Sequence, residues 1–98
     1  MQFLVTGFDG TDALALERRL AVRDAHLKAV TEASEKGEHL YGAALLDEAG
    51  KMIGSFLVVE YEDRKALDDW LETEPYVLGK VWERIEITPC KVAPTFAR

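Results

Sequence analysis

A histidine, two arginines and a distant glutamate–tyrosine segment are the residues whose types and spacing suggest chemistry. Arg19, Arg23 and His26 are separated by four and three residues, which places them on one side of a helix. Glu74 and Tyr76 flank a proline that restricts the backbone between them. A carboxylate beside a histidine selects its tautomer and favours acid–base catalysis near neutral pH. If the two segments meet, they form a site for proton transfer on a small molecule.

Arg23 is predicted to lie within the apolar stripe of its helix. The stripe expected to face the sheet consists of Leu16, Leu20, Leu27 and Val30. A guanidinium there loses hydration, so it needs a carboxylate or an anionic ligand. Two interpretations stay open. Arg23 reaches solvent at the sheet edge or pairs with an acid from a strand; alternatively Arg19, Arg23 and His26 line a cleft that binds an anion, with Arg23 holding an enolate or carboxylate.

Motifs for metals, phosphates and nucleotides are missing from the sequence. No glycine-rich phosphate loop, dinucleotide fingerprint or histidine–glutamate zinc motif is present. His26 and His39 lie apart, without a cysteine pair beside them. We therefore expect no cofactor and no metal. The single cysteine, Cys90, is expected to be a small core residue.

The charge and composition exclude several partners. A formal net charge of −6 and a pI of about 4.8 oppose binding to nucleic acid or to anionic membrane surfaces. No apolar run approaches the ~20 residues that span a bilayer, and no signal peptide is recognisable at the N-terminus. We expect a cytoplasmic protein with one domain over residues 1–98.

The elements that must position these residues alternate in type along the chain. Strands are predicted at 2–8, 38–46, 52–61 and 81–92, and helices at 13–36 and 64–73. Thr11 or Asp12 and Asp63 are the expected helix caps, Gly37 ends the first helix, and a proline ends the second. The order βαββαβ predicts an α+β, ferredoxin-like fold: a four-stranded antiparallel sheet with two helices on one face. The tail, 93–98, is expected to be irregular or to reach a partner.

The third predicted strand is apolar on both faces. One face carries Met52, Phe56 and Val58, and the other carries Ile53, Leu57, Val59 and Tyr61. A sheet with water on one side should alternate apolar and polar residues. Two helices cover one face only, so a second copy of the chain is the simplest cover for the other. The sequence therefore predicts a homodimer formed through the sheet face.

Several short segments resemble the YciI-like (YCII-related) proteins of the dimeric α+β barrel superfamily. In chain order they are Arg23-Asp24-Ala25-His26-Leu27, Gly42-Ala43-Ala44-Leu45, Gly54-Ser55, Glu74-Pro75-Tyr76 and Ile85-Glu86-Ile87-Thr88-Pro89. The resemblance implies a dimer of ferredoxin-like subunits and an active-site pair of a histidine and an acid. The pair carries over to His26 and Glu74, although the family acid is usually an aspartate before proline.

Three functional hypotheses follow. The first is a cofactor-independent enzyme that shifts protons on a small anionic or cyclic compound, as an isomerase or lyase does, with His26 and Glu74 catalytic and with Arg19, Arg23 and Tyr76 binding substrate. The second is a non-catalytic metabolite-binding or regulatory homodimer, and the third a purely structural interaction module. RNA binding is disfavoured because the exposed aromatic residues that it needs lack a basic surround and are expected to form dimer core.

Overall fold

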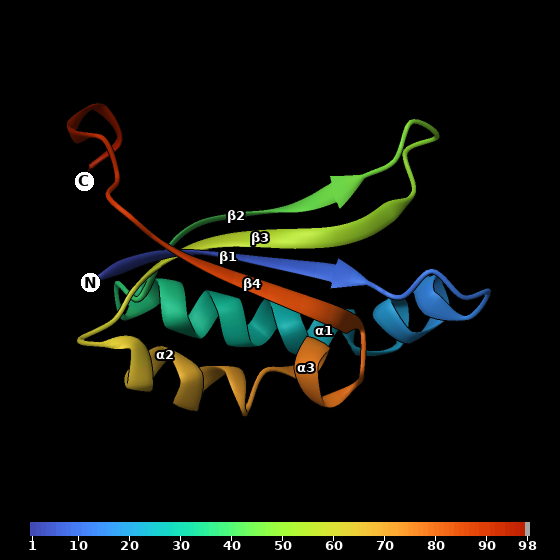
Figure 1. The fold of residues 1–98 in the computed structure, drawn as a ribbon. Helices are drawn as coiled ribbons and strands as arrows, with labels where there is room; N and C mark the ends of the chain where they lie inside the picture. The colour runs from blue at the N-terminus through green and yellow to red at the C-terminus, as the bar shows by residue number, and fades with distance from the viewer. Residues whose placement is uncertain (98) are drawn as a thin grey trace.

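One antiparallel sheet and three α-helices make up the fold. The computed structural model describes residues 1–97. The strands are β1 (Gln2–Asp9), β2 (His39–Leu46), β3 (Met52–Glu60) and β4 (Trp82–Cys90); the helices are α1 (Ala15–Glu35), α2 (Arg64–Leu71) and α3 (Pro75–Leu78). The sheet has the order β2-β3-β1-β4, and the helices lie on one side of it (Figure 1). The predicted ferredoxin-like fold is confirmed, with α3 as an unpredicted addition.

The segment predicted as a loop around Pro75 is a short helix. Pro75 occupies the first helical position, where its missing N–H has no intrahelical partner to lose. The Glu74 carboxylate caps this helix by accepting the Tyr76 backbone N–H at 3.2 Å. The preceding helix ends at Leu71, and its predicted cap is confirmed because Asp63 accepts the Ala66 N–H at 2.8 Å. Two consecutive caps therefore set the path of the chain beneath the sheet.

Helix α1 turns a different side toward the sheet from the predicted one. Its buried residues are Ala15, Arg19, His26 and Ala33. Leu20 and Leu27 are 53% and 43% exposed, and Arg23 is exposed with them. The predicted stripe was therefore wrong at Leu20 and Leu27, whereas Val30 packs against the core as predicted. Arg19 and His26 are buried because carboxylates from other elements bind them, a compensation that hydropathy along one helix does not reveal.

The helix-covered face of the sheet carries the core. Phe3 and Val5 of β1 pair with Val59 and Leu57 of β3, and all four are buried. They pack against Leu67 of α2 and against further residues of the core cluster. Leu57, Val59 and Tyr61, which were predicted to share one face of the third strand, lie in this core as predicted. Ile53 of the same predicted set is 45% exposed.

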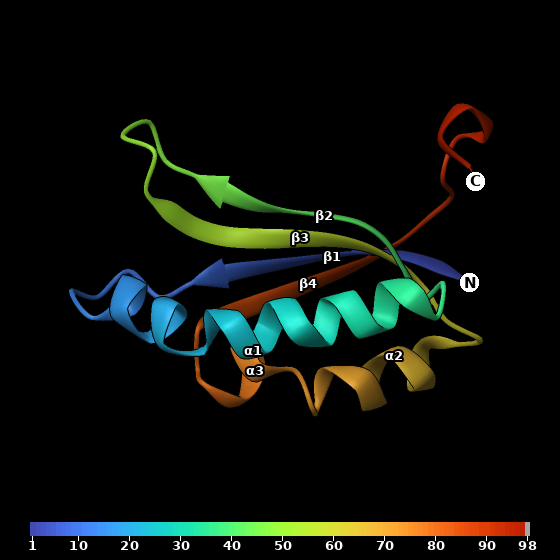
Figure 2. The same ribbon diagram turned by 180° about the vertical axis from the view of Figure 1, so that it is seen from behind.

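Within residues 1–97, no α-helix or strand lies over the opposite face of the sheet (Figure 2). Leu4 pairs with Val58, and Phe56, two residues before Val58 in β3, lies on the same face. These three side chains are half-buried. Tyr41, which pairs with Val58 from β2, is 64% exposed. We call this apolar surface the open face.

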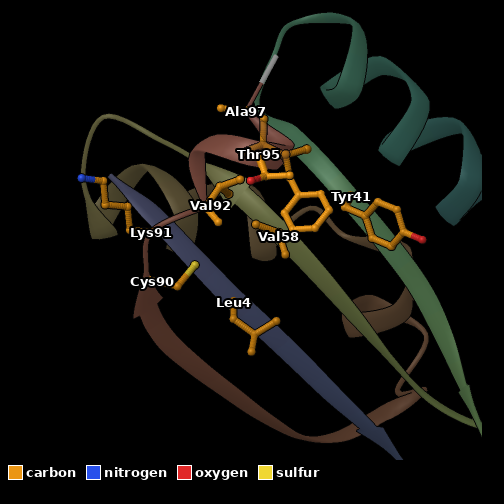
Figure 3. A pocket seen from close by; sticks show the side chains of 11 residues that line it. Leu4, Tyr41, Val58, Cys90, Lys91, Val92, Thr95 and Ala97 are labelled. Carbon is orange, nitrogen blue, oxygen red and sulfur yellow. The ribbon is translucent and has the colours of Figure 1, made fainter.

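The C-terminal segment leaves the sheet on the side of the open face (Figures 1 and 2). Together with the open face it bounds a pocket of about 730 Å³ whose walls include Leu4, Tyr41, Val58 and Cys90 (Figure 3). Cys90 is exposed, so its prediction as a core residue was wrong. The fourth strand points this cysteine away from the helices, toward the pocket. Of the tail predicted over 93–98, residue 98 lies outside the described residues.

His39, at the start of β2, is a buried titratable group that lies apart from the dyad described below. Its ring contacts Trp70 edge to face, and its Nε2 lies 3.2 Å from the Tyr61 hydroxyl. Loss of hydration, with a smaller contribution from the charge of His26, lowers the pKa of His39 from 6.5 to about 4. The folded protein therefore keeps His39 neutral at pH values where the unfolded chain protonates it.

This difference predicts a loss of stability in mild acid. Because the unfolded chain binds more protons between pH 6.5 and 4, the contribution of His39 is complete above pH 6.5 and falls as the pH drops toward 4. The full contribution of His39 to the free energy of unfolding is about 3 kcal/mol. Urea denaturation of the wild type and of His39→Phe at several pH values measures it, since all other groups cancel in the difference. A difference independent of pH would contradict the lowered pKa.

Among residues 1–97, no helix combines the length and the apolar character needed to cross a bilayer.

Candidate functional site

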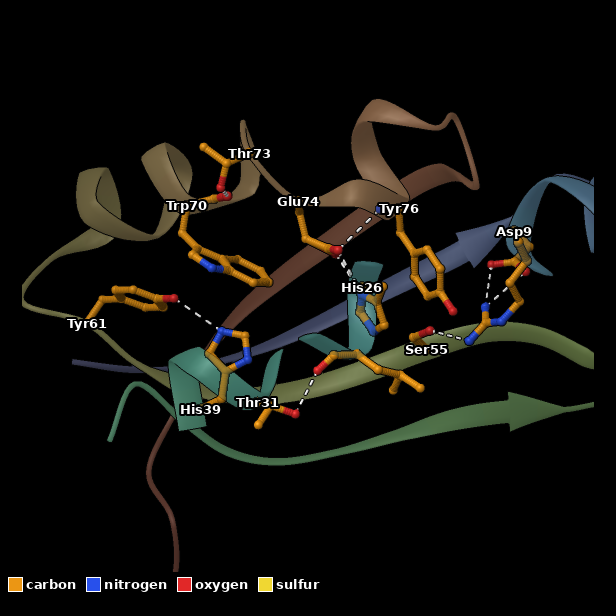
Figure 4. A network of polar contacts seen from close by, with 12 residues as sticks. Asp9, His26, Thr31, His39, Ser55, Tyr61, Trp70, Thr73, Glu74 and Tyr76 are labelled. Atoms are coloured by element: carbon orange, nitrogen blue, oxygen red, sulfur yellow. Dashed lines mark hydrogen bonds and ion pairs between the residues drawn. The ribbon is translucent and has the colours of Figure 1, made fainter. Parts of the chain in front are cut away.

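A buried histidine–carboxylate pair lies between α1 and the start of α3 (Figure 4). The His26 Nδ1 is 2.7 Å and 3.0 Å from the two carboxylate oxygens of Glu74. The ionised carboxylate only accepts hydrogen bonds, so Nδ1 carries the donated proton. Nε2 of the neutral ring is then the nitrogen with a free lone pair. Within the described residues, the His26 side chain makes hydrogen bonds through Nδ1 alone.

Glu74 is held more tightly than a surface cap would be. Its side chain is fully buried, and it accepts from both His26 and the Tyr76 backbone N–H. A buried carboxylate loses hydration, and these donors offset that loss. The side chain therefore has two roles, as cap of α3 and as partner of His26.

The Tyr76 ring covers one side of the histidine. Its centroid lies 3.8 Å from that of His26, and the two planes are 7° apart. Trp82 contacts both rings edge-on, with centroids 6.0 Å from His26 and 5.6 Å from Tyr76. Burial raises the pKa of the Tyr76 phenol, and the positive charges of Arg19 and Arg23 partly oppose that rise. Tyr76 is therefore a neutral hydroxyl beside the dyad.

A second buried polar cluster adjoins Tyr76 and joins α1 to the sheet. Arg19 donates through Nη1 to both Asp9 oxygens at 3.0 Å and through Nη2 to the Ser55 hydroxyl at 2.7 Å. The Arg19 guanidinium carbon lies 4.8 Å from the Tyr76 ring centroid. Loss of hydration raises the pKa of Asp9, although the Arg19 hydrogen bonds and charge act in the opposite direction. We call Asp9, Arg19 and Ser55 the arginine cluster.

The Arg19 Nε in this cluster is buried and has no hydrogen-bond partner among the described residues. An unpaired buried donor costs about 1–3 kcal/mol. An oxygen acceptor from a bound water or ligand would satisfy this N–H group.

Four of the five predicted site residues come together. His26, Glu74, Tyr76 and Arg19 form one continuous set of contacts, whereas Arg23 lies on the exposed side of α1. Its charge acts on Tyr76 only through the pKa effect described above. Arg19 is bound by Asp9, so it is half of an ion pair and not a free cation.

Sequence reasoning missed Asp9, Ser55 and Trp82. Asp9 lies one residue beyond the predicted first strand, and Ser55 entered only as part of a segment that resembles the family. The position of Trp82 is indicated by Gly7, but this becomes visible only once the strands are paired. A Cβ on Gly7 would lie 2.4 Å from its indole ring, so glycine at this point of β1 makes room for the tryptophan beside His26.

The arrangement has the side chains that acid–base chemistry needs. No group of three or more metal-binding side chains occurs in residues 1–97. An oriented histidine with a free Nε2, a phenol and an ion pair can take up a proton, return it and hold polar substituents.

Sequence comparison places the chain among small bacterial proteins. A family profile described as the YCII-related domain matches residues 1–91. Protein YciI of Escherichia coli is 30% identical over 97 residues, which cover 93% of this chain and 97% of YciI. An uncharacterised protein of Haemophilus influenzae is 32% identical over 83 residues, covering 78% of this chain and 84% of that protein.

Two solved structures share the fold. The first is 5-chloro-2-hydroxyhydroquinone dehydrochlorinase of Burkholderia phenoliruptrix, in complex with 2,5-dihydroxybenzoquinone. It has a TM-score of 0.82 and 22% identity, covering 97% of this chain and 98% of the other. An antibiotic biosynthesis monooxygenase has a TM-score of 0.54 and 17% identity, covering 95% and 98%. The fold therefore occurs in enzymes of small molecules.

Proposed function

Because the chain belongs to the YCII-related family, we propose that it is an enzyme that transfers protons on a small cyclic compound without a cofactor. The observation that carries the proposal is the 2.7 Å contact between His26 Nδ1 and the fully buried carboxylate of Glu74. A histidine oriented in this way has one nitrogen fixed and the other free to react.

In the proposed mechanism His26 Nε2 removes a proton from a hydroxyl group or an acidic carbon of the substrate. Glu74 keeps the proton of Nδ1 in place and stabilises the imidazolium that forms. The same imidazolium then returns the proton to a second atom or to a leaving group. Tyr76 holds the imidazole plane by stacking at 3.8 Å and offers its hydroxyl to the substrate.

The dehydrochlorinase suggests the substrate class. Its name gives a chlorinated hydroxyhydroquinone as its substrate, a ring whose hydroxyl groups lose protons readily, and its fold covers nearly the whole of this chain. We therefore propose a hydroxylated ring compound as the substrate here. The neutral Tyr76 and the Asp9–Arg19 pair suit a polar ring better than a strongly anionic molecule.

We also propose that two copies associate through the open face. Leu4, Phe56 and Val58 form an apolar surface that no element of the described chain covers, and Tyr41 extends it. An exposed apolar surface in the middle of a sheet favours association, and a sheet pairs most simply with an identical sheet.

A regulatory, non-catalytic dimer is the second candidate. The observation that favours it is the depth of the dyad, since the His26 side chain is 8% exposed and Glu74 is fully buried. A buried pair of this kind also suits a pocket that recognises a metabolite without converting it.

Turnover distinguishes the two candidates. Benzene-1,2,4-triol in deuterated buffer and 5-chloro-2-hydroxyhydroquinone, both kept anaerobic, are assayed by NMR for ring-proton exchange and for chloride release. We expect the wild type to catalyse at least one of these reactions and His26→Ala to be about 10²- to 10⁴-fold slower.

The control is Lys28→Ala, an exposed residue two positions further along α1, which should retain full activity. Binding of both compounds without conversion would favour the regulatory dimer. Equal rates for the wild type and His26→Ala would overturn the proposed mechanism.

A further inference from the structure

A cavity of about 780 Å³ lies where the helix layer and the sheet part at one end of the molecule. It is bounded by the end of β1, the start of α1, the start of β3 and the start of β4. Its walls include Phe8, Leu16 and Ile53, and Asp9 belongs to its polar lining. The volume falls within the range of sites that hold small molecules.

Asp9 connects this cavity to the candidate site. Each step of the connection is a contact: Asp9 binds Arg19 at 3.0 Å, Arg19 lies 4.8 Å from the Tyr76 ring centroid, and Tyr76 stacks on His26. Figure 4 shows Tyr76 between His26 and Asp9. Arg19 and His26 are seven residues apart, so about 10 Å of helix separates them. A ring compound that binds beside Asp9 therefore lies next to the residue that joins the cavity to Tyr76.

The buried Asp9 carboxylate in the lining of the cavity favours a ligand with hydroxyl groups. The Asp9 carboxylate has four acceptor positions and uses two of them on Arg19. Its remaining positions can accept from a ligand hydroxyl. An acceptor of this kind matches a hydroxyl group, which donates a hydrogen bond.

The outer walls favour a flat ring. The Arg84 guanidinium carbon lies 3.9 Å from the Phe8 ring centroid, which makes a planar stack at the cavity. Leu16 and Ile53 add aliphatic surface. The charged groups in the lining are Asp9, Lys51, Glu83 and Arg84, two of each sign, so they do not select a ligand by net charge.

We propose that this cavity is the substrate entrance, and that Asp9, held in place by Arg19, selects neutral, hydroxyl-bearing rings by accepting a hydrogen bond from a ring hydroxyl. The assignment rests on the proposed function, because it takes His26 as the reacting group. It adds the route of entry and the residues that determine specificity.

The experiment blocks the cavity without touching the polar residues. Ile53 is 45% exposed and lines the cavity, so Ile53→Trp fills it from the outside. The matched control is Leu78→Trp, a 66% exposed residue of α3 outside the lining. Anaerobic calorimetry measures binding of benzene-1,2,4-triol and of 1,2,4-trimethoxybenzene, while NMR follows the His26 ring protons during each titration.

We expect the triol to bind the wild type and Leu78→Trp equally, and Ile53→Trp at least 10-fold more weakly. The trimethoxy compound, which donates no hydrogen bond, should bind the wild type at least 10-fold more weakly than the triol. Equal affinity of Ile53→Trp and wild type, with the His26 signals still shifting, would overturn the entrance alone. Equal affinity for triol and ether would overturn the role of Asp9 and Arg19. Triol binding that leaves the His26 signals unmoved would overturn the proposed function as well.

Discussion

Replacement of Glu74 by Gln should reduce turnover by about 10²- to 10⁴-fold while the substrate still binds. The change keeps the size of the side chain and its carbonyl oxygen, but it removes the negative charge that faces His26 Nδ1 at 2.7 Å. The imidazolium formed during proton transfer then lacks a counter-charge in a buried position. The loss should therefore appear in kcat and not in KM.

The same replacement should also destabilise the fold by about 1–3 kcal/mol. Glu74 is fully buried, so the new amide N–H₂ group loses its hydration and faces the proton that His26 Nδ1 carries. Urea denaturation measures this loss separately from turnover. Glu72→Gln, a charge removal at an exposed position two residues earlier, is the matched control and should leave both quantities unchanged.

Glu74→Asp separates the two roles of the side chain. Aspartate is a good helix cap, so α3 should form. Its shorter side chain lengthens the contact with His26, so turnover should fall while stability changes little. If Glu74→Gln were as active as the wild type, Glu74 would be a structural cap only.

Val58→Asp should prevent association of the two copies. Val58 lies in the middle of the open face, between Leu4 of β1 and Tyr41 of β2. A carboxylate buried there in a sheet-to-sheet contact would have no partner, at a cost of several kcal/mol. We expect the dissociation constant to rise at least ~1,000-fold, which corresponds to about 4 kcal/mol.

Sedimentation equilibrium at several protein concentrations measures this change. Leu78→Asp places the same charge on an exposed leucine of the helix layer, and it should leave association intact. A wild-type protein that stays monomeric and well folded at micromolar concentration would contradict the proposed dimer.

The strands and two of the helix ends were predictable because the sequence patterns that mark them are local. Alternating apolar residues, the Asp63 cap and the left-handed Gly37 (φ 78°) each depend on neighbours within a few positions. The strand ends differ from prediction by one or two residues. Such small differences leave the positions of the site residues unchanged.

The orientation of α1 was not predictable from hydropathy. Leucine at 20 and 27 looked like core, yet Arg19 and His26 are buried in their place. Their partners lie 10 to 48 residues away along the chain, so a helical projection holds no trace of them. Residue types and the family resemblance pointed to His26 and Glu74 as a pair, whereas their separation of 48 residues along the chain did not. Asp9 and Ser55 escaped notice because their importance arises only when the strands are paired.

The double use of Glu74 links reactivity to folding in a way that restricts evolution of the site. A helix of four residues has few backbone hydrogen bonds of its own, and its first free amide is bound by the same carboxylate that orients His26. A mutation of Glu74 that changes the basicity of His26 also destabilises α3. A mutation that destabilises α3 in turn displaces the carboxylate that orients His26. Divergent relatives should therefore alter their specificity through the surrounding walls, leaving this acidic position among the last to change.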